Sequence, residues 1–299
     1  MSRILPVFLT FLLLFGGLPS ASAASKKKSA TKSSAPAKQA PKKKELAEAF
    51  PLEKEGGIPR IRSAAAIVVD ANSGRVLHEV NADQPRPVAS TQKLLTALIV
   101  AESGNLQQSI VVQPSDTWAE PSKLYLKAGE VYPRYRFLQI LLVKSMNDVA
   151  RALARDNAGS LDSFAARMNI KAQQLGMTNS HFVNPNGLPA AGQYSTARDM
   201  SRVALAAYQN RTIRSIVNQR TLSFQYADGR MKDFTNTNRV LRNSSFCNGM
   251  KTGYTEASGF CLISSGTSGG RDIITVVLGG KRDTIWTDSY RLLSWGLSS

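Results

Sequence analysis

Ser90 and Lys93 form the first pair in this chain whose residue types and spacing could support a reaction. They stand three positions apart in the stretch Ser90-Thr91-Gln92-Lys93, and residues i and i+3 share one face of a helix. A serine hydroxyl is a weak nucleophile until a base takes its proton, and a lysine becomes such a base when burial or nearby positive charge lowers its pKa. A serine at a helix start also has backbone N–H groups that can stabilise an oxyanion. Alone, the pattern also fits a capping serine beside a solvated lysine.

Two further short motifs follow this pair, once each and in order along the chain. Ser145-Met146-Asn147 lies between two expected helices, and Lys251-Thr252-Gly253 lies on an expected strand near the C-terminus. Ser-x-x-Lys, Ser-x-Asn and Lys-Thr-Gly are together the signature of penicillin-recognising serine enzymes. Because chance agreement of all three is improbable, the combined pattern predicts one cleft with a nucleophilic serine.

Longer stretches around these motifs resemble one family. They are residues 86–90 (RPVAS), 145–150 (SMNDVA), 175–182 (LGMTNSHF), 186–188 (NGL), 195–200 (STARDM) and 249–259 (GMKTGYTEASG). Residues 60–299 resemble the low-molecular-weight penicillin-binding proteins of the D-alanyl-D-alanine carboxypeptidase family, serine peptidase family S11. The resemblance implies a serine D-Ala-D-Ala carboxypeptidase that acts on peptidoglycan stem peptides, uses no metal or cofactor, and is inhibited by β-lactams.

The resemblance also implies a role for each catalytic residue. Ser90 would attack the carbonyl between two D-alanines and form an acyl-enzyme, while Lys93 would accept its proton. Ser145, with Lys251 nearby, would pass a proton to the leaving amine. Asn147 would hydrogen-bond the substrate amide and hold Lys93 in place.

The third motif would bind the substrate on a strand. Lys251 and Thr252 would hold the terminal carboxylate. Gly253 would let the substrate backbone approach closely, and the backbone N–H groups of Tyr254 and of the nucleophile would form the oxyanion hole. Arg198 is expected to brace a helix start, with support of the carboxylate pocket through Thr252 as the lesser alternative.

Three other functions remain as alternatives. A D,D-endopeptidase that cleaves peptidoglycan cross-links would use the same residues. The form Ser145-Met146-Asn147-Asp148 favours the carboxypeptidase, whereas the short remainder after Gly253, residues 254–299, leaves no room for the C-terminal β-domain of many carboxypeptidases. A β-lactamase is disfavoured because no Glu-x-x-x-Asn element lies between the second and third motifs. A non-catalytic wall-binding module is disfavoured because both Ser90 and Lys93 are present.

The elements that must position these residues follow from periodicity and turn signals. A hairpin is expected around Asn72-Ser73-Gly74, and strands over 221–226, 250–252, 260–264 and 273–278. Helices are expected to begin at Ser90, to cover 137–145 and 149–153, and to be capped by Ser160, by Ser195 or Thr196, and by Asp283. Strands at both ends predict an antiparallel sheet built from the two termini, with the N- and C-terminal helices on its faces. The expected fold is a mixed α and β, β-lactamase/transpeptidase-like three-layer αβα domain with a mostly helical lobe and a cleft between.

The N-terminal region has a different composition. Residues 1–23 combine Arg3, a short apolar run and a small-residue cleavage site, which predicts a signal peptide and export to the periplasm or the cell exterior. Residues 24–57 are expected to form a Lys/Ala/Ser/Pro-rich disordered tether, and residues 58–299 the catalytic domain. Eight lysines in 24–44 and Arg3 account for nine of the 17 net positive charges, so residues 45–299 carry +8. The tether is either a solvated spacer or a contact to an anionic membrane or wall polymer, and export excludes nucleic acid as a partner.

The chain has two histidines and two cysteines, too few for a zinc-finger framework or an HExxH metal site. His181 stands apart from any acid and is expected to be a packing or loop residue, and His78 a surface residue. Cys247 and Cys261 flank the third motif. Two buried free thiols are favoured over a cross-strand disulfide beside the site.

Overall fold

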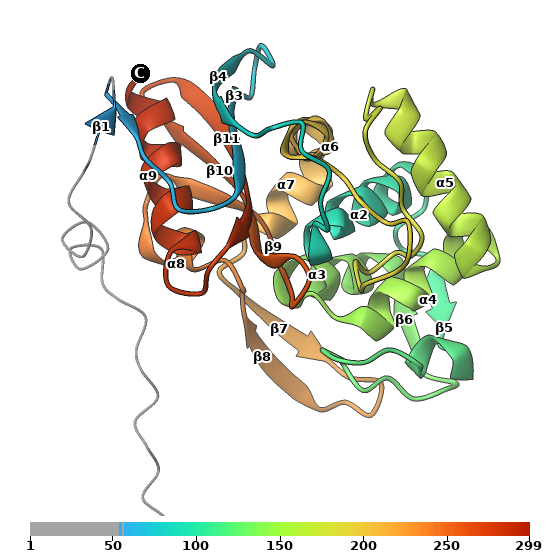
Figure 1. The fold of residues 1–299 in the computed structure, drawn as a ribbon. Helices are drawn as coiled ribbons and strands as arrows, with labels where there is room; N and C mark the ends of the chain where they lie inside the picture. The colour runs from blue at the N-terminus through green and yellow to red at the C-terminus, as the bar shows by residue number, and fades with distance from the viewer. Residues whose placement is uncertain (1–53, 56) are drawn as a thin grey trace, which may run out of the picture. The chain divides into compact units, whose positions relative to one another are not determined.

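We describe the protein from a computed structural model, which covers residues 54–55 and 57–299 (Figure 1). The predicted signal peptide and most of the predicted tether lie outside the described residues. The elements in chain order are β1 (Lys54–Glu55), β2 (Ile58–Pro59), β3 (Ala65–Asp70), β4 (Val76–Val80), η1 (Ala89–Gln92), α2 (Lys93–Glu102), β5 (Ser109–Val111), η2 (Pro114–Thr117), β6 (Val131–Pro133), α3 (Arg134–Lys144), α4 (Asn147–Ala158), α5 (Leu161–Gln174), α6 (Ala197–Gln209), α7 (Arg211–Val217), β7 (Thr221–Gln225), β8 (Met231–Thr235), α8 (Arg239–Asn243), β9 (Cys247–Thr255), β10 (Gly259–Ser268), β11 (Arg271–Gly280) and α9 (Ile285–Ser298).

The main sheet is antiparallel and unites both ends of the described chain. Its five strands lie in the order β4-β3-β11-β10-β9. The inner strand β3 is a run of Ala, Ile and Val that is buried along almost its whole length, as expected for a strand covered on both faces. Strand β9, which carries the third motif, lies at the sheet edge, so half of its backbone groups are not taken up by pairing within the sheet. The prediction of an antiparallel sheet from the two termini is therefore confirmed.

Helices cover both faces of this sheet and complete the three layers (Figure 1). Helix α9 packs on β10, β11 and β3 on one face, whereas α6 packs on β11 and β3 and α7 packs on β9 on the other. The second of these faces adjoins the larger hydrophobic core, which continues into the helices α2 to α5. The expectation that an N-terminal helix covers a face is wrong. The first α-helix of the described residues, α2, is instead the buried centre of the helical lobe, and all its residues from Lys93 to Val100 are buried.

The helix ends follow local capping. Ser160 Oγ accepts a hydrogen bond from the backbone N–H of Ser163 and begins α5, as predicted. Thr196, rather than Ser195, caps α6, because its Oγ1 accepts from the N–H of Asp199 at 3.0 Å. Helix α9 begins one residue later than predicted, with Thr284 and not Asp283 at the N-cap. No helix in the described ranges is long and apolar enough to cross a membrane.

Four short elements depart from the expectations. Strand β7 pairs with β8 in a separate two-stranded hairpin and takes no part in the main sheet. Helices α7 and α8 were not predicted, because seven and five residues are too few to show a clear apolar period. Strand β1, at the end of the predicted tether, pairs with β2.

Candidate active site

Ser90 lies in the 3₁₀ turn η1, which runs directly into α2. In a 3₁₀ turn the side chains of residues i and i+3 eclipse each other, so the predicted meeting of Ser90 and Lys93 occurs although Ser90 precedes the α-helix. Lys93 Nζ lies 2.7 Å from Ser90 Oγ. Ala89, just before the nucleophile, has a left-handed backbone with φ 49°, a conformation that costs energy in a residue with a side chain.

Lys93 is fully buried, and three oxygens surround its amine. Nζ lies 2.7 Å from Ser90 Oγ, 2.7 Å from Asn147 Oδ1 and 2.6 Å from the carbonyl oxygen of Asn186. Asn147 Nδ2 donates to the carbonyl of Pro121 at 2.6 Å, which fixes the amide so that its oxygen faces the lysine. Asn147 Oδ1 and the Asn186 carbonyl oxygen can only accept, so each takes one N–H of the Lys93 amine. In the neutral amine, the remaining lone pair then points to the Ser90 hydroxyl.

Burial and charge both favour that neutral amine. Burial lowers the pKa of Lys93 well below its usual value, and the positive charge of Lys251 lowers this pKa further, while Asp148 opposes the shift. Lys251 is itself fully buried, which lowers its pKa to about 7. Burial thus weakens proton binding at both lysines, and at Lys93 the charge of Lys251 weakens it further.

Two glycines let neighbouring chain segments touch the nucleophile turn. A Cβ on Gly253 would lie 2.8 Å from the backbone nitrogen of Ser90, so β9 runs directly against the turn. A Cβ on Gly187 would lie 2.1 Å from the carbonyl oxygen of Ala89, and Gly187 also has φ 82°. Both positions therefore require glycine. The close approach at Gly253 is to the enzyme's own backbone and brings the N–H groups of Ser90 and β9 together.

The second motif forms the junction between α3 and α4. Ser145 ends α3 in a left-handed conformation, with φ 71°, and its hydroxyl has no hydrogen-bond partner among the described residues. Asn147 begins α4, and its N–H donates to the carbonyl of Ser122. The buried carboxylate of Asp148 accepts hydrogen bonds from the N–H groups of Leu124 and Leu126, and so anchors the loop to which Asn147 is bonded.

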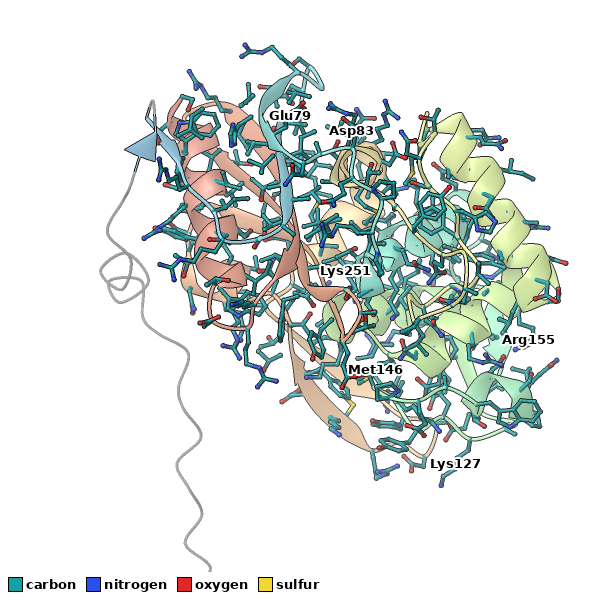
Figure 2. The ribbon with its side chains drawn as sticks, viewed as in Figure 1. Glu79, Asp83, Lys127, Met146, Arg155 and Lys251 are labelled. Carbon is teal, nitrogen blue, oxygen red and sulfur yellow. The ribbon has the colours of Figure 1, made fainter. Side chains whose placement is uncertain are left out.

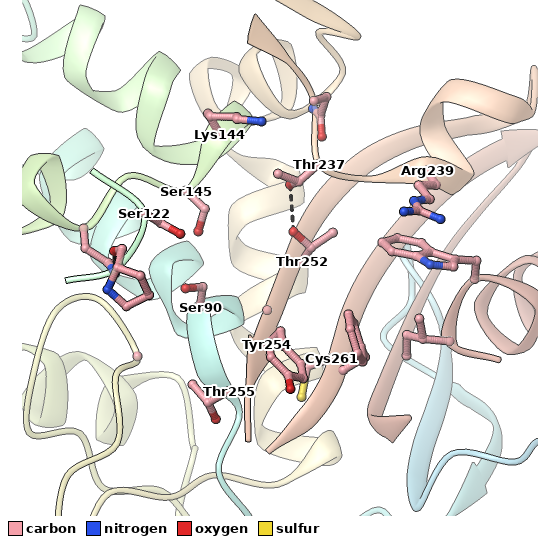
Figure 3. A pocket seen from close by; sticks show the side chains of 18 of the residues that line it. Ser90, Ser122, Lys144, Ser145, Thr237, Arg239, Thr252, Tyr254, Thr255 and Cys261 are labelled. Carbon is pink, nitrogen blue, oxygen red and sulfur yellow. Dashed lines mark hydrogen bonds between the residues drawn. The ribbon is translucent and has the colours of Figure 1, made fainter. Parts of the chain in front are cut away.

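These residues surround a cleft of about 500 Å³ (Figure 3). Six of the eight predicted site residues line it, namely Ser90, Ser145, Asn147, Thr252, Gly253 and Tyr254. Lys93 and Lys251 lie buried beneath its surface. The hydroxyl of Thr252 donates to Thr237 Oγ1 at 2.7 Å. No aspartate or glutamate is among the residues that line the cleft.

Arg198 lies outside this cleft. Its guanidinium forms ion pairs with Glu79 at 2.9 Å and with Asp83 at 2.7 Å, and both carboxylates lie away from Lys251 (Figure 2). These carboxylates raise the pKa of Arg198 above its usual value. The bracing role is confirmed, because Arg198 ties the start of α6 to β4 and the loop after it. Support of a carboxylate pocket through Thr252 is wrong.

The histidines and cysteines take no part in the Ser–Lys contact. His181 pairs through its backbone with Tyr194, and its Nδ1 lies 2.9 Å from the Gly192 carbonyl, so it is a loop residue as predicted. His78 is half-buried against the ring of Trp295 rather than fully on the surface. Both cysteines are free and buried, and burial raises the pKa of Cys247 to about 12 and that of Cys261 to about 11.

The sequence interpretation assigned no role to several residues of the site, among them Asp148, Asn186, Thr237 and Arg239. Asn186 lies in a stretch that carried the family resemblance, but its contribution is a backbone carbonyl, which residue type cannot reveal. Asp148 directly follows the second motif, and this position next to Asn147 could have identified it. Thr237 and Arg239 lie in an unpredicted segment around α8.

Within residues 54–55 and 57–299 there is no group of three or more His, Cys, Asp or Glu side chains that could hold a metal ion. The fold and the Ser–Lys site place the chain in the structural class of the DD-peptidases. A carboxypeptidase from Mycobacterium tuberculosis H37Rv superimposes with a TM-score of 0.77 and 31% identity, over 81% of this chain and 93% of that one.

The family follows from the sequence match. The family model described as D-alanyl-D-alanine carboxypeptidase, Peptidase_S11, matches residues 53–282, and the chain belongs to this family. The carboxypeptidase DacA of Escherichia coli K12 is 34% identical over 80% of this chain, which spans 62% of the length of DacA. A D-alanyl-D-alanine endopeptidase of Pseudomonas aeruginosa is 32% identical over 82% of this chain and 79% of its own length.

Proposed function

We propose that this protein is a serine D-Ala-D-Ala carboxypeptidase that hydrolyses peptidoglycan stem peptides through an acyl-enzyme on Ser90. One observation carries the proposal: the fully buried Lys93 amine lies 2.7 Å from Ser90 Oγ, and its two other neighbours are acceptor-only oxygens. This arrangement activates a serine without histidine. Family membership supplies the substrate class.

In acylation, Ser90 Oγ forms a bond to the carbonyl carbon of the penultimate D-alanine while its proton passes to Lys93. The N–H groups of Ser90 and Tyr254 stabilise the oxyanion, because β9 and the nucleophile turn meet at Gly253. The C–N bond then breaks, and the leaving amine takes a proton through Ser145. Water next adds to the ester carbon, the ester C–O bond breaks, and Ser90 regains its proton.

The third motif and Asn147 orient the substrate. In the Thr252–Thr237 pair Thr252 donates to Thr237, so the Thr237 hydroxyl is left to donate to the terminal carboxylate, and buried Lys251 adds positive charge when it is protonated. Asn147 holds Lys93 through its oxygen and lines the cleft beside the substrate amide. With no carboxylate in the cleft lining to activate water, a penicilloyl ester on Ser90 is expected to be long-lived, unlike that of a β-lactamase.

The second candidate is a D,D-endopeptidase at the same site. It is supported by the similarity to the relative from P. aeruginosa, which is named a D-alanyl-D-alanine endopeptidase. The form of the second motif, with Asp148 after Asn147, favours the carboxypeptidase. Both candidates share every residue of the mechanism and differ in the leaving group.

The experiment is intact-mass spectrometry after penicillin treatment, followed by digestion of purified muropeptides. We expect a stable adduct on the native protein, none on Ser90→Ala, and release of D-alanine from monomeric pentapeptides. Conversion of cross-linked dimers to monomers would instead identify an endopeptidase. No adduct, together with no change in either substrate, would overturn the proposal and favour a wall-binding module.

We further propose export to the periplasm or cell exterior, directed by residues 1–23, and peripheral attachment of the tether to an anionic membrane or wall polymer. Eight lysines without an acid in residues 24–44 support this attachment.

A further inference from the structure

The end of the cleft beyond Thr252 is cationic. Lys144, Arg239 and Arg242 line it, and none of the three has an ion pair with any described acid. Lys144 lies next to Thr237, because the Thr237 N–H donates to the carbonyl of Val143 at 3.2 Å. Figure 3 shows Lys144 and Arg239 on the two sides of Thr237, at the end remote from Thr255.

Two buried donors at this end are also unsatisfied. Arg242 Nε and Trp286 Nε1 are both buried and have no acceptor among the described residues, and both residues line the cleft. A buried donor without an acceptor is costly, so such groups are expected to meet an acceptor in the working protein. The Arg239 guanidinium is held over the Trp286 ring at 5.2 Å from the centroid, and so it is partly fixed before any ligand arrives.

Positive charge here exceeds what the predicted substrate requires. A terminal D-alanine carries one carboxylate, and the Thr252–Thr237 hydroxyl pair, next to the nucleophile turn, is placed to receive it. Burial and the neighbouring Arg239 lower the pKa of Arg242, which is the strain expected of two cations without a counter-ion. A second anion would relieve that repulsion and supply acceptors to both orphan donors.

We propose that Arg239, Arg242 and Lys144, with Trp286, form a second anion subsite that binds a further carboxylate of the leaving group. This inference rests on the proposed acyl transfer at Ser90 and concerns its leaving-group specificity. It makes a leaving group with two or more carboxylates, such as the amine-side peptide of a cross-link, a better substrate than D-alanine alone. The same acyl-transfer site then accepts both kinds of leaving group and binds one with a second carboxylate more tightly.

The test compares two synthetic peptides with the same acyl part ending in D-alanine, followed by D-glutamate in one and D-glutamine in the other. They differ only in the second carboxylate. We expect the native protein to hydrolyse the D-glutamate peptide with a kcat/KM about tenfold higher, the effect of one charge-assisted contact. The double variant Arg239→Gln, Arg242→Gln should bring the ratio to about one. Arg214→Gln, which removes an arginine stacked on Tyr208 outside the cleft, should leave the ratio unchanged.

A ratio of one in the native protein, or a preference that survives in the double variant, would overturn the subsite. Calorimetry on the Ser90→Ala variant measures the Kd of each peptide without turnover, and we expect the two Kd values to differ by a similar factor. This binding measurement therefore separates a failure of the proposed acyl transfer from a failure of the subsite. Penicillin could leave Ser90 unmodified while the D-glutamate peptide still binds more tightly and loses this advantage when Arg239 and Arg242 are replaced. In that case the subsite is supported and the acyl-transfer reaction is not.

Discussion

At the scale of single residues, the site depends on the charge state of one buried amine. Lys93 must be neutral to accept the Ser90 proton, and a free lysine is almost fully charged at neutral pH. Burial supplies the main shift, and Lys251 adds to it. Asn147 and the Asn186 carbonyl fix the direction of the remaining lone pair. The base is thus produced by its surroundings, which explains why Ser-x-x-Lys alone is a weak signal.

The variant Lys251→Met tests the electrostatic part of this account. The positive charge of Lys251 lowers the pKa of Lys93, so its removal raises that pKa. Because the neutral amine is the base, the acid limb of the penicillin acylation rate should move to higher pH. Rates measured by stopped-flow between pH 5 and 10 give the limb, with Lys171→Met, a surface lysine paired with Glu102, as the control. A limb that stays in place or moves to lower pH would contradict the coupling.

At the scale of elements, the nucleophile turn η1 is held between β9 and the loop that carries Gly187. The two contacts are tight enough that neither glycine has room for a methyl group. Ala89, directly before Ser90, and Ser145, between α3 and α4, both have a strained left-handed backbone. Strain therefore occurs at both segments that position a serine in the cleft. Packing of whole elements, rather than the local helix preference, therefore sets the position of Ser90.

Gly187→Ala and Gly229→Ala separate steric contact from backbone strain. Both glycines have positive φ, 82° and 86°, but only Gly187 has neighbours within reach of a Cβ. We expect Gly229→Ala to cost about 1 kcal/mol of unfolding free energy from strain, and Gly187→Ala about 1–3 kcal/mol more from overpacking. Urea unfolding measures the difference. Penicillin acylation should fall at least about tenfold in Gly187→Ala only. Equal losses in the two variants would show that the contact with Ala89 does not position Ser90.

Much of the fold and site could be predicted from sequence, and the misses have physical causes. The three motifs and the terminal strands were visible because residue type, continuous apolar runs and turn signals encode them. The Ser90 turn was expected as α-helix, because 3₁₀ and α turns place residue i+3 almost alike. Asn186 acts through a backbone carbonyl and α8 is only five residues long, so neither leaves a pattern. The cationic end of the cleft arises from segments far apart in the chain, which only the tertiary structure unites.

At the scale of the whole molecule, charge is divided between two regions. The lysines of residues 24–44 carry eight of the 17 net positive charges, whereas the cleft is lined by residues between 90 and 286. No residue of 24–44 has a role in the proposed mechanism. The two regions should therefore act independently on a small substrate.

Replacement of the eight lysines of residues 24–44 by glutamine keeps the length of the chain and removes the charge. We expect kcat/KM for a small soluble D-Ala-D-Ala peptide to stay unchanged, because no step of the mechanism uses these residues.

Binding to vesicles of anionic phospholipid should be lost in the variant, since each lysine near such a surface contributes about 1 kcal/mol. The native protein should bind these vesicles but not neutral ones, and 1 M salt should release it by screening. A large fall in turnover would make the tether part of the site, and equal binding by both proteins would move the attachment surface to the domain, where +8 of the net charge remains.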